Sequence, residues 1–266
     1  MKTCTIVLCK DEMDNLPYVR RYWERIGCDV VVMDNGSTDG SLEYLSKLPY
    51  VRILHFDSEG HNDVIQKSVK EQAYRMFKNQ YDIIVISDLD EVFYFSDFKA
   101  LSEAFVASDY NVLMTPIITL CESFKPPYSE DKLLHQQCHM FYKQRMNHME
   151  GFDDYSKLSI FNTRLTDRIE MSVGQHYVQT YPAMNIMLTN DGFNLHICNG
   201  FGEDYFVDKR KMQFKRLSDT NKKYGMGVEY GKDEQQTREE YRNNQKKSFD
   251  INDSSGTTMQ NGESDV

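Results

Sequence analysis

The sequence lacks the features that would assign it to several specialised classes of protein. None of its apolar runs approaches the ~20 residues that a transmembrane helix needs, which excludes a membrane-spanning chain. With 40% hydrophobic residues it is neither collagen-like nor mostly disordered. Lys and Arg total 31 against 41 Asp and Glu, and the net charge of -10 argues against a general nucleic-acid-binding protein. Together with a mean hydropathy of -0.63, these numbers predict a soluble globular protein of one large domain, with or without a tail.

Cysteine is also scarce, and its placement bears on the compartment. The 6 cysteines include no Cys-x-x-Cys pair, and the apolar residues 5–8 are too few for a signal-peptide core. We therefore expect a cytoplasmic protein without a disulfide framework. The grouping that most resembles a zinc site comprises Cys121, His135, Cys138 and His139. We favour the interpretation that these four are ordinary core and loop residues.

Strand and helix patterns alternate over residues 1–90. Apolar, β-branched runs predict strands at 5–8, 29–33, 51–56 and 82–87. Apolar residues at helical spacing predict helices at 16–26, 42–48 and 65–77. This alternation predicts right-handed βαβ units and a parallel sheet, in which ligands bind beyond the carboxyl ends of the strands. Acidic clusters follow three of the predicted strands, at residues 10–12, 34–39 and 88–91, so we expect them to converge on one edge.

The rest of the chain is less regular. Helices are predicted at 97–107 and 203–217, and strands at 111–120, 157–161, 169–173 and 194–197. From residue 231 the chain is polar and poor in apolar residues, which predicts a disordered tail at 231–266 behind a single domain at 1–230.

The pair Asp88 and Asp90 is the most informative motif. Two carboxylates at the end of a buried strand repel each other and favour protonation unless a cation relieves them. A divalent metal with hard oxygen ligands, Mg²⁺ or Mn²⁺, is the usual cation, and it keeps open positions for substrate phosphates. A solvated turn with two unpaired aspartates is the alternative.

Several segments together resemble the family 2-type glycosyltransferases of the GT-A fold. The similarity lies in Lys-Asp-Glu at 10–12, DNGSTDGS at 34–41 and Asp-Leu-Asp-Glu-Val-Phe at 88–93, a form typical of the subgroup with a DxDE-aromatic motif. Residues 157–161, 174–176, 194–196 and 205–227 resemble later parts of that subgroup. The resemblance implies an α/β fold, with a GT-A-like, Rossmann-type, mostly parallel sheet flanked by helices. One departure is Asp11, where the family carries an asparagine, because an aspartate cannot donate a hydrogen bond as an amide does.

The resemblance also implies site residues. The donor, a UDP- or GDP-sugar, would contact a set of acidic residues comprising Asp11, Glu12, Asp34, Asp39 and Asp88. For Asp39, capping of the next helix is an equally open interpretation. Asp88 and Asp90 would hold Mn²⁺ or Mg²⁺, with His196 as a third ligand unless it is simply a packed core imidazole. His176 is a weaker candidate of the same kind.

The remaining site candidates concern the acceptor and the phosphates. An inverting transfer needs an Asp or Glu as general base, and the candidates are Asp153, Asp154, Glu203 and Glu150. A basic stretch could bind phosphate, although a solvated helix face is favoured; it comprises Lys209, Arg210, Lys211, Lys215 and Arg216.

The sequence therefore predicts a metal-dependent glycosyltransferase, of the hexosyltransferase type. It would move a sugar from a nucleotide-sugar donor to a hydroxyl of a glycan or lipid-linked saccharide, with inversion. We expect no nucleic-acid partner and no transmembrane segment, and peripheral membrane contact is compatible with the sequence. Two alternatives are open: a haloacid-dehalogenase-like phosphatase in which Asp88 and Asp90 act on phosphorus, and a non-catalytic nucleotide-sugar-binding protein.

Overall fold

The computed structural model describes residues 1–143, 156–175, 177–197 and 200–252. The strands are β1 (Thr3–Cys9), β2 (Asp29–Asp34), β3 (Val51–His55), β4 (Ile83–Asp88), β5 (Glu91–Phe95), β6 (Val112–Leu120), β7 (Phe141–Tyr142), β8 (Ser156–Asn162), β9 (Arg168–Met171), β10 (Val178–Tyr181), β11 (Ile186–Leu188) and β12 (Gly192–His196). The α helices are α1 (Leu16–Ile26), α2 (Ser41–Leu45), α3 (Asp63–Phe77), α4 (Phe98–Ala107), α5 (Glu203–Lys215), α6 (Asp219–Tyr224) and α7 (Glu234–Lys246). Short 3₁₀ helices are η1 (Leu134–Gln136), η2 (Val173–Gln175) and η3 (Val228–Gly231).

One large sheet runs through the molecule in the order β3-β2-β1-β4-β8-β6-β12-β5. The first four strands are parallel, as the alternating pattern predicts, while β8 and β5 are antiparallel to their neighbours. The register pairs Cys9 with Asp34 and Leu8 with Asp88, so β1, β2 and β4 end at one level. The predicted convergence of strand ends on one edge is therefore confirmed.

Helices cover both faces of this parallel section because strand residues alternate between them. On one face, Val7 of β1 packs with Leu16 and Trp23 of α1. On the other, Ile6 packs with Tyr74 and Phe77 of α3. The mixed α/β fold, a mostly parallel sheet flanked by helices, matches the expected class.

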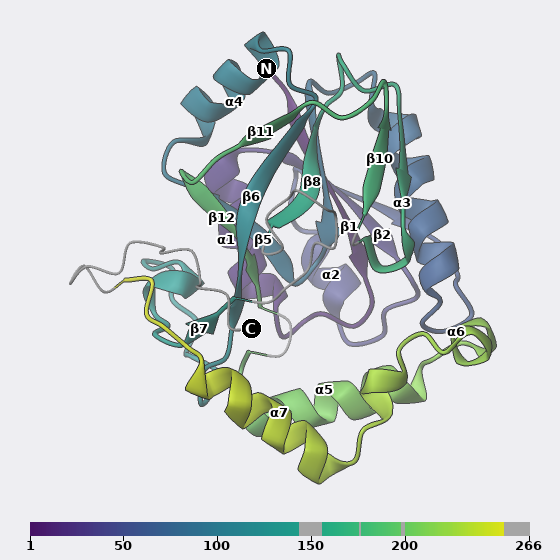
Figure 1. The fold of residues 1–266 in the computed structure, drawn as a ribbon, viewed down its shortest axis with the longest axis vertical. Helices are drawn as coiled ribbons and strands as arrows, with labels where there is room; N and C mark the ends of the chain where they lie inside the picture. The colour runs from purple at the N-terminus through teal and green to yellow at the C-terminus, as the bar shows by residue number, and fades with distance from the viewer. Residues whose placement is uncertain (144–155, 176, 198–199, 253–266) are drawn as a thin grey trace, which may run out of the picture.

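A helical layer made of α5, α6 and α7 lies below the carboxyl edge of the sheet, with α5 and α7 side by side (Figure 1). This corrects the predicted boundary at residue 230, because α7 falls in the segment expected to be a disordered tail. Tyr241 is 2% exposed, its ring lies 5.3 Å from that of Phe206, and its hydroxyl donates to the Glu122 carbonyl. One buried aromatic residue anchors a helix that is otherwise polar, which composition alone does not reveal. The folded region extends to residue 252, and 253–266 lie outside the described residues.

The four candidate zinc ligands serve as core and loop residues. His135 lies against Tyr22, whose hydroxyl is 2.9 Å from its Nδ1, and His139 pairs with Asp250. Cys121 and Cys138 are buried, and burial raises the pKa of the Cys121 thiol to about 12. Within the part of the chain that the structure describes, no three His, Cys, Asp or Glu side chains are grouped to hold a metal ion.

Candidate functional site

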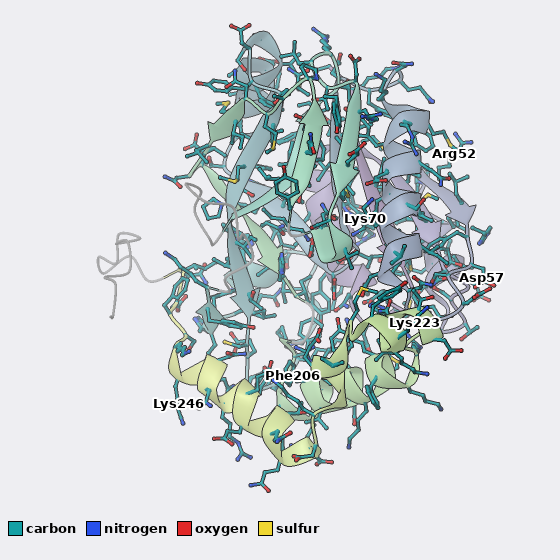
Figure 2. The ribbon with its side chains drawn as sticks, turned by 45° about the vertical axis from the view of Figure 1, so that its right-hand side comes forward. Arg52, Asp57, Lys70, Phe206, Lys223 and Lys246 are labelled. Atoms are coloured by element: carbon teal, nitrogen blue, oxygen red, sulfur yellow. The ribbon has the colours of Figure 1, made fainter. Side chains whose placement is uncertain are left out.

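A pocket of about 720 Å³ opens at the carboxyl edge of the parallel strands. Its walls come from the residues that follow β1, β2, β3 and β4, from α3 on one side, and from α5 in the helical layer. Figure 2 shows Lys70 of α3 and Phe206 of α5, both of which line this pocket. The position is the one at which an α/β sheet binds its ligands.

Asp88, at the end of β4, forms an ion pair with Lys70. The Lys70 ammonium donates to Asp88 Oδ1 at 2.7 Å and to Gln175 Oε1 at 2.9 Å. The lysine side chain is only 7% exposed, whereas that of Asp88 is 46% exposed and faces the pocket. Burial acts to raise the pKa of Asp88, but Lys70 and Lys157 outweigh it and hold that pKa well below its usual range.

Asp90 is paired with a different lysine. Lys209 of α5 places its ammonium 3.1 Å from Asp90 Oδ2 and 3.4 Å from both carboxylate oxygens of Glu12. Burial and the nearby Asp90 charge raise the pKa of Glu12 to about 7, against the opposing effect of Lys209. Glu12 and Asp90, which follow different strands, thus share one buried cation.

Glu91 is the most deeply buried acid of the motif. The Lys157 ammonium of β8 lies 2.6 Å from both Glu91 oxygens, and the two side chains are 4% and 7% exposed. Burial acts to raise the pKa of Glu91, but Lys157 and His196 outweigh this effect, and the pKa is lowered overall. The antiparallel pairing of β12 with β5 sets His196 opposite Glu91, with Nε2 3.5 Å from Glu91 Oε1. Burial lowers the pKa of His196, which favours the neutral imidazole.

Among the five predicted donor-binding residues, Glu12 and Asp88 line the pocket. Asp34 is completely buried and accepts hydrogen bonds from the Gly36 and Ser37 amides, so it fixes the turn after β2. Asp39 accepts from the amide and hydroxyl of Ser41 at the start of α2, in line with the capping interpretation.

Asp11, the departure from the family pattern, has a left-handed backbone with φ of 52°. Its Oδ1 accepts from the Thr38 amide at 2.7 Å, and its Oδ2 pairs with Arg216 at 2.5 Å. Asp11 therefore joins the loop after β1 to the loop after β2 and to the end of α5. An asparagine would keep the Thr38 contact but lose the charge that pairs with Arg216.

The three metal-ligand candidates all line the pocket, but they do not form a cluster. Asp88 and Asp90 pair with separate lysines, and His196 lies beside Glu91. The buried His196 Nε2 has no hydrogen-bond partner among the described residues.

Three of the four general-base candidates, Asp153, Asp154 and Glu150, lie outside the described residues, as does the weaker metal candidate His176. Glu203 forms ion pairs with Arg238 and Arg242 of α7 and is not among the residues that line the pocket.

The basic stretch divides between the pocket and the surface. Lys209, Arg210 and Arg216 line the pocket. Lys211 is exposed and pairs with Glu234, and Lys215 is also exposed. The interpretation as a solvated face holds only for these last two.

Sequence reasoning missed Lys70 and Lys157, although both left a signal. Lys70 lies four residues before Tyr74 and seven before Phe77, on the buried face of α3. Lys157 is the charged residue of β8, a strand that is buried from Lys157 to Asn162. A lysine at a position where the periodicity predicts burial indicates a buried acidic partner, because an isolated buried ammonium is too costly.

Comparisons with known proteins give structural likenesses only. The chain is similar to a crystal structure of TarS from S. aureus at 12% identity and a TM-score of 0.46, over 92% of this chain and 43% of that one. It is also similar to TarS 1-349 in complex with UDP-GlcNAc, at 11% identity and a TM-score of 0.40, over 92% and 72% of the two chains. The chain thus spans less than half the length of the first of these. No protein-family model and no curated protein matches it. At this level of likeness, the function has to be inferred from the site itself.

Proposed function

We propose that this chain is a glycosyltransferase that binds a nucleotide-sugar donor in the pocket and transfers the sugar to a hydroxyl of a glycan or lipid-linked saccharide. The observation that carries the proposal is the meeting of Glu12, Asp88 and Asp90 at the carboxyl edge of two neighbouring parallel strands, β1 and β4. The resemblance of residues 10–12, 34–41 and 88–93 to family 2-type enzymes gives this arrangement its chemical interpretation.

The same pocket has the chemistry for a metal-bound diphosphate. Asp88 and Asp90 bring hard carboxylate oxygens to its wall, which suit Mg²⁺ or Mn²⁺. Two protein ligands leave the other positions of such an ion for diphosphate oxygens and water. Bound there, a divalent cation would supply Lewis-acid stabilisation of the negative charge that develops on the leaving diphosphate. His196 lies against Glu91, and we assign it to the support of that carboxylate.

The other pocket residues are suited to orient the donor. Glu12 presents a carboxylate that can accept hydrogen bonds from the nucleobase or ribose, once it is ionised. Arg210 and Arg216 bring further positive charge from α5 to the same wall. Inversion at the sugar requires a carboxylate to take the acceptor proton, for which Asp153 and Asp154 remain the proposed candidates.

A donor panel tests the proposal directly. Unfolding temperature is measured with UDP-GlcNAc, UDP-glucose and GDP-mannose, each with and without Mn²⁺, because a ligand that binds the native state raises it. Release of UDP or GDP is then followed with candidate acceptors.

Turnover should be lost in Asp88→Asn and Asp90→Asn and retained in Asp167→Asn. Asp167 is an exposed residue that pairs with Lys78 on the surface. Binding without turnover would instead favour the non-catalytic binding protein. Asp88-dependent hydrolysis of an aryl phosphate would favour the phosphatase.

A further inference from the structure

Each aspartate of the motif is matched by a lysine from a different helix. Lys70 comes from α3 and Lys209 from α5, and both line the pocket (Figure 2 shows Lys70). Both lysine side chains are 7% exposed. Their ammonium groups are therefore fixed parts of the site and not mobile surface charges.

Each of these lysines also has a second acceptor beside its aspartate. Lys70 donates to Gln175 Oε1 at 2.9 Å, and Lys209 lies 3.4 Å from Glu12. An ammonium has three N–H donors and needs several acceptors when buried. The second acceptor can hold each ammonium in the pocket when its aspartate engages another cation.

A divalent cation and an ammonium compete for the same carboxylate. Metal–oxygen distances of ~2.1 Å would bring a divalent ion close to an ammonium that now lies 2.7 Å from Asp88 Oδ1. The two positive charges repel strongly in a partly buried site. The negative charge of a diphosphate would allow the divalent ion and the ammonium to remain in the pocket together.

We propose that Lys70 and Lys209 occupy Asp88 and Asp90 in the donor-free protein and exchange them for diphosphate oxygens when cation and donor bind together. The inference rests on the proposed function and deepens it: the ligand that the site takes is a metal–nucleoside-diphosphate complex. Without the diphosphate, the lysines weaken divalent-cation binding. Cation and nucleotide therefore increase each other's affinity by one and the same factor.

Two binding measurements on the full chain test the exchange. Mn²⁺ affinity without nucleotide is measured by electron paramagnetic resonance, and UDP affinity at saturating Mn²⁺ by calorimetry. The variants are Lys70→Met and Lys209→Met. Matched controls are Lys78→Met, at the end of α3 beside Asp167, and Lys211→Met, on α5 beside Glu234. Each control removes one positive charge from the same helix, or in the case of Lys78 from its C-cap, without touching the motif.

The two affinities should move in opposite directions. Each pocket variant should bind Mn²⁺ about fivefold or more tightly, since a competing cation is gone. Each should bind UDP about tenfold or more weakly, since a charged hydrogen bond to phosphate is lost. The controls should stay within about twofold of the unaltered protein for both ligands.

Other patterns overturn the inference. Unchanged or weaker Mn²⁺ binding in both pocket variants would mean that the lysines only support the fold of the pocket. UDP binding that needs no Mn²⁺ would also overturn it, while leaving the proposed donor site intact. Absence of both UDP and GDP binding in the unaltered protein would refute the proposed function itself. Circular dichroism checks folding, and Lys70→Gln, which keeps a donor for Asp88 and Gln175, replaces Lys70→Met if that variant does not fold.

Discussion

Removal of the Lys157 ammonium should destabilise the protein far more than removal of a surface lysine. In Lys157→Met, the Glu91 carboxylate keeps its buried position but loses the cation 2.6 Å from both its oxygens. His196 also lies beside Glu91, but burial lowers the pKa of its imidazole and favours the neutral form. The variant therefore contains an uncompensated buried charge.

The magnitude follows from the burial of the pair. With side-chain exposures of 4% and 7%, solvent screens the Lys157–Glu91 pair very little. Breaking such a pair by removing one partner costs about 3–5 kcal/mol. For a chain of this size that corresponds to a fall in unfolding temperature of roughly 6–20 °C. Lys78→Met, which breaks a surface pair with Asp167, should change the free energy of unfolding by about 0.5 kcal/mol or less.

Urea unfolding at pH 8, where His196 cannot compensate by protonation, measures both variants. The pH dependence gives a second check. In the unaltered protein the pKa of Glu91 is lowered, so its stabilising contribution is present above the unfolded value of 4.5 and is lost as pH falls through the folded value. In Lys157→Met, the largest opposing charge is gone, so burial raises the pKa of Glu91. The penalty then disappears as Glu91 is protonated, so the difference between the two proteins should shrink towards pH 4.

The double variant Glu91→Leu/Lys157→Met separates charge from packing. It should recover much of the lost stability, because replacing a buried ion pair by apolar residues is often close to neutral. A cost below about 1 kcal/mol for Lys157→Met at pH 8, or a double variant no more stable than the single one, would refute this account of the pair.

Three further predictions follow from other contacts. The pKa of Glu12 is raised from 4.5 to about 7, so its contribution to the free energy of unfolding should fall by up to about 3 kcal/mol between pH 4.5 and 7 and stay constant above pH 7. Urea unfolding of Glu12→Gln should not show this decrease. Tyr241→Ala should cost about 3–5 kcal/mol by calorimetry; a cost below about 1 kcal/mol would mean that Tyr241 does not anchor α7 to the fold. Tyr22→Phe should cost about 1–3 kcal/mol, since the Tyr22 hydroxyl satisfies both the ring and the amide of His135; an unchanged urea midpoint would contradict this.

The parallel half of the fold was predictable because burial there follows simple periodicities. The alternation of Ile6 and Val7 between two faces, and the apolar stripe of α1, place each element without tertiary information. The antiparallel additions were harder, since β5 begins inside the acidic motif at Glu91 and pairs with the distant β12, joining Phe95 to Gly192 and Glu91 to His196. Helix α7 was missed because Tyr241 is its one buried aromatic residue, and its other contacts, such as the Arg238 and Arg242 pairs with Glu203, are polar.

At the site, the sequence predicted the carboxylates but not the lysines that pair with them. Spacing along the chain located the carboxylates, because Glu12, Asp88 and Asp90 follow strands that end at one level. It did not locate their cations, because a lysine on the buried face of a helix has no local partner to reveal it. The resemblance implies that Asp34 and Asp39 contact the donor. In the structure both carboxylates accept hydrogen bonds from backbone amides, Asp34 from Gly36 in the adjacent turn and Asp39 from Ser41 at the start of α2.

The pairing of Lys70 with Asp88 and of Lys209 with Asp90 changes the interpretation of the acidic motif. Two unpaired aspartates on a strand end would require a metal ion simply to relieve their repulsion. In this chain Lys70 and Lys209 already provide that relief, so the fold does not depend on a bound cation for this purpose. Affinity for a divalent ion can then be tied to the presence of a second anion in the pocket. The proposed exchange would make the site respond to cation and diphosphate as a pair, which is the behaviour that the Lys70 and Lys209 variants measure.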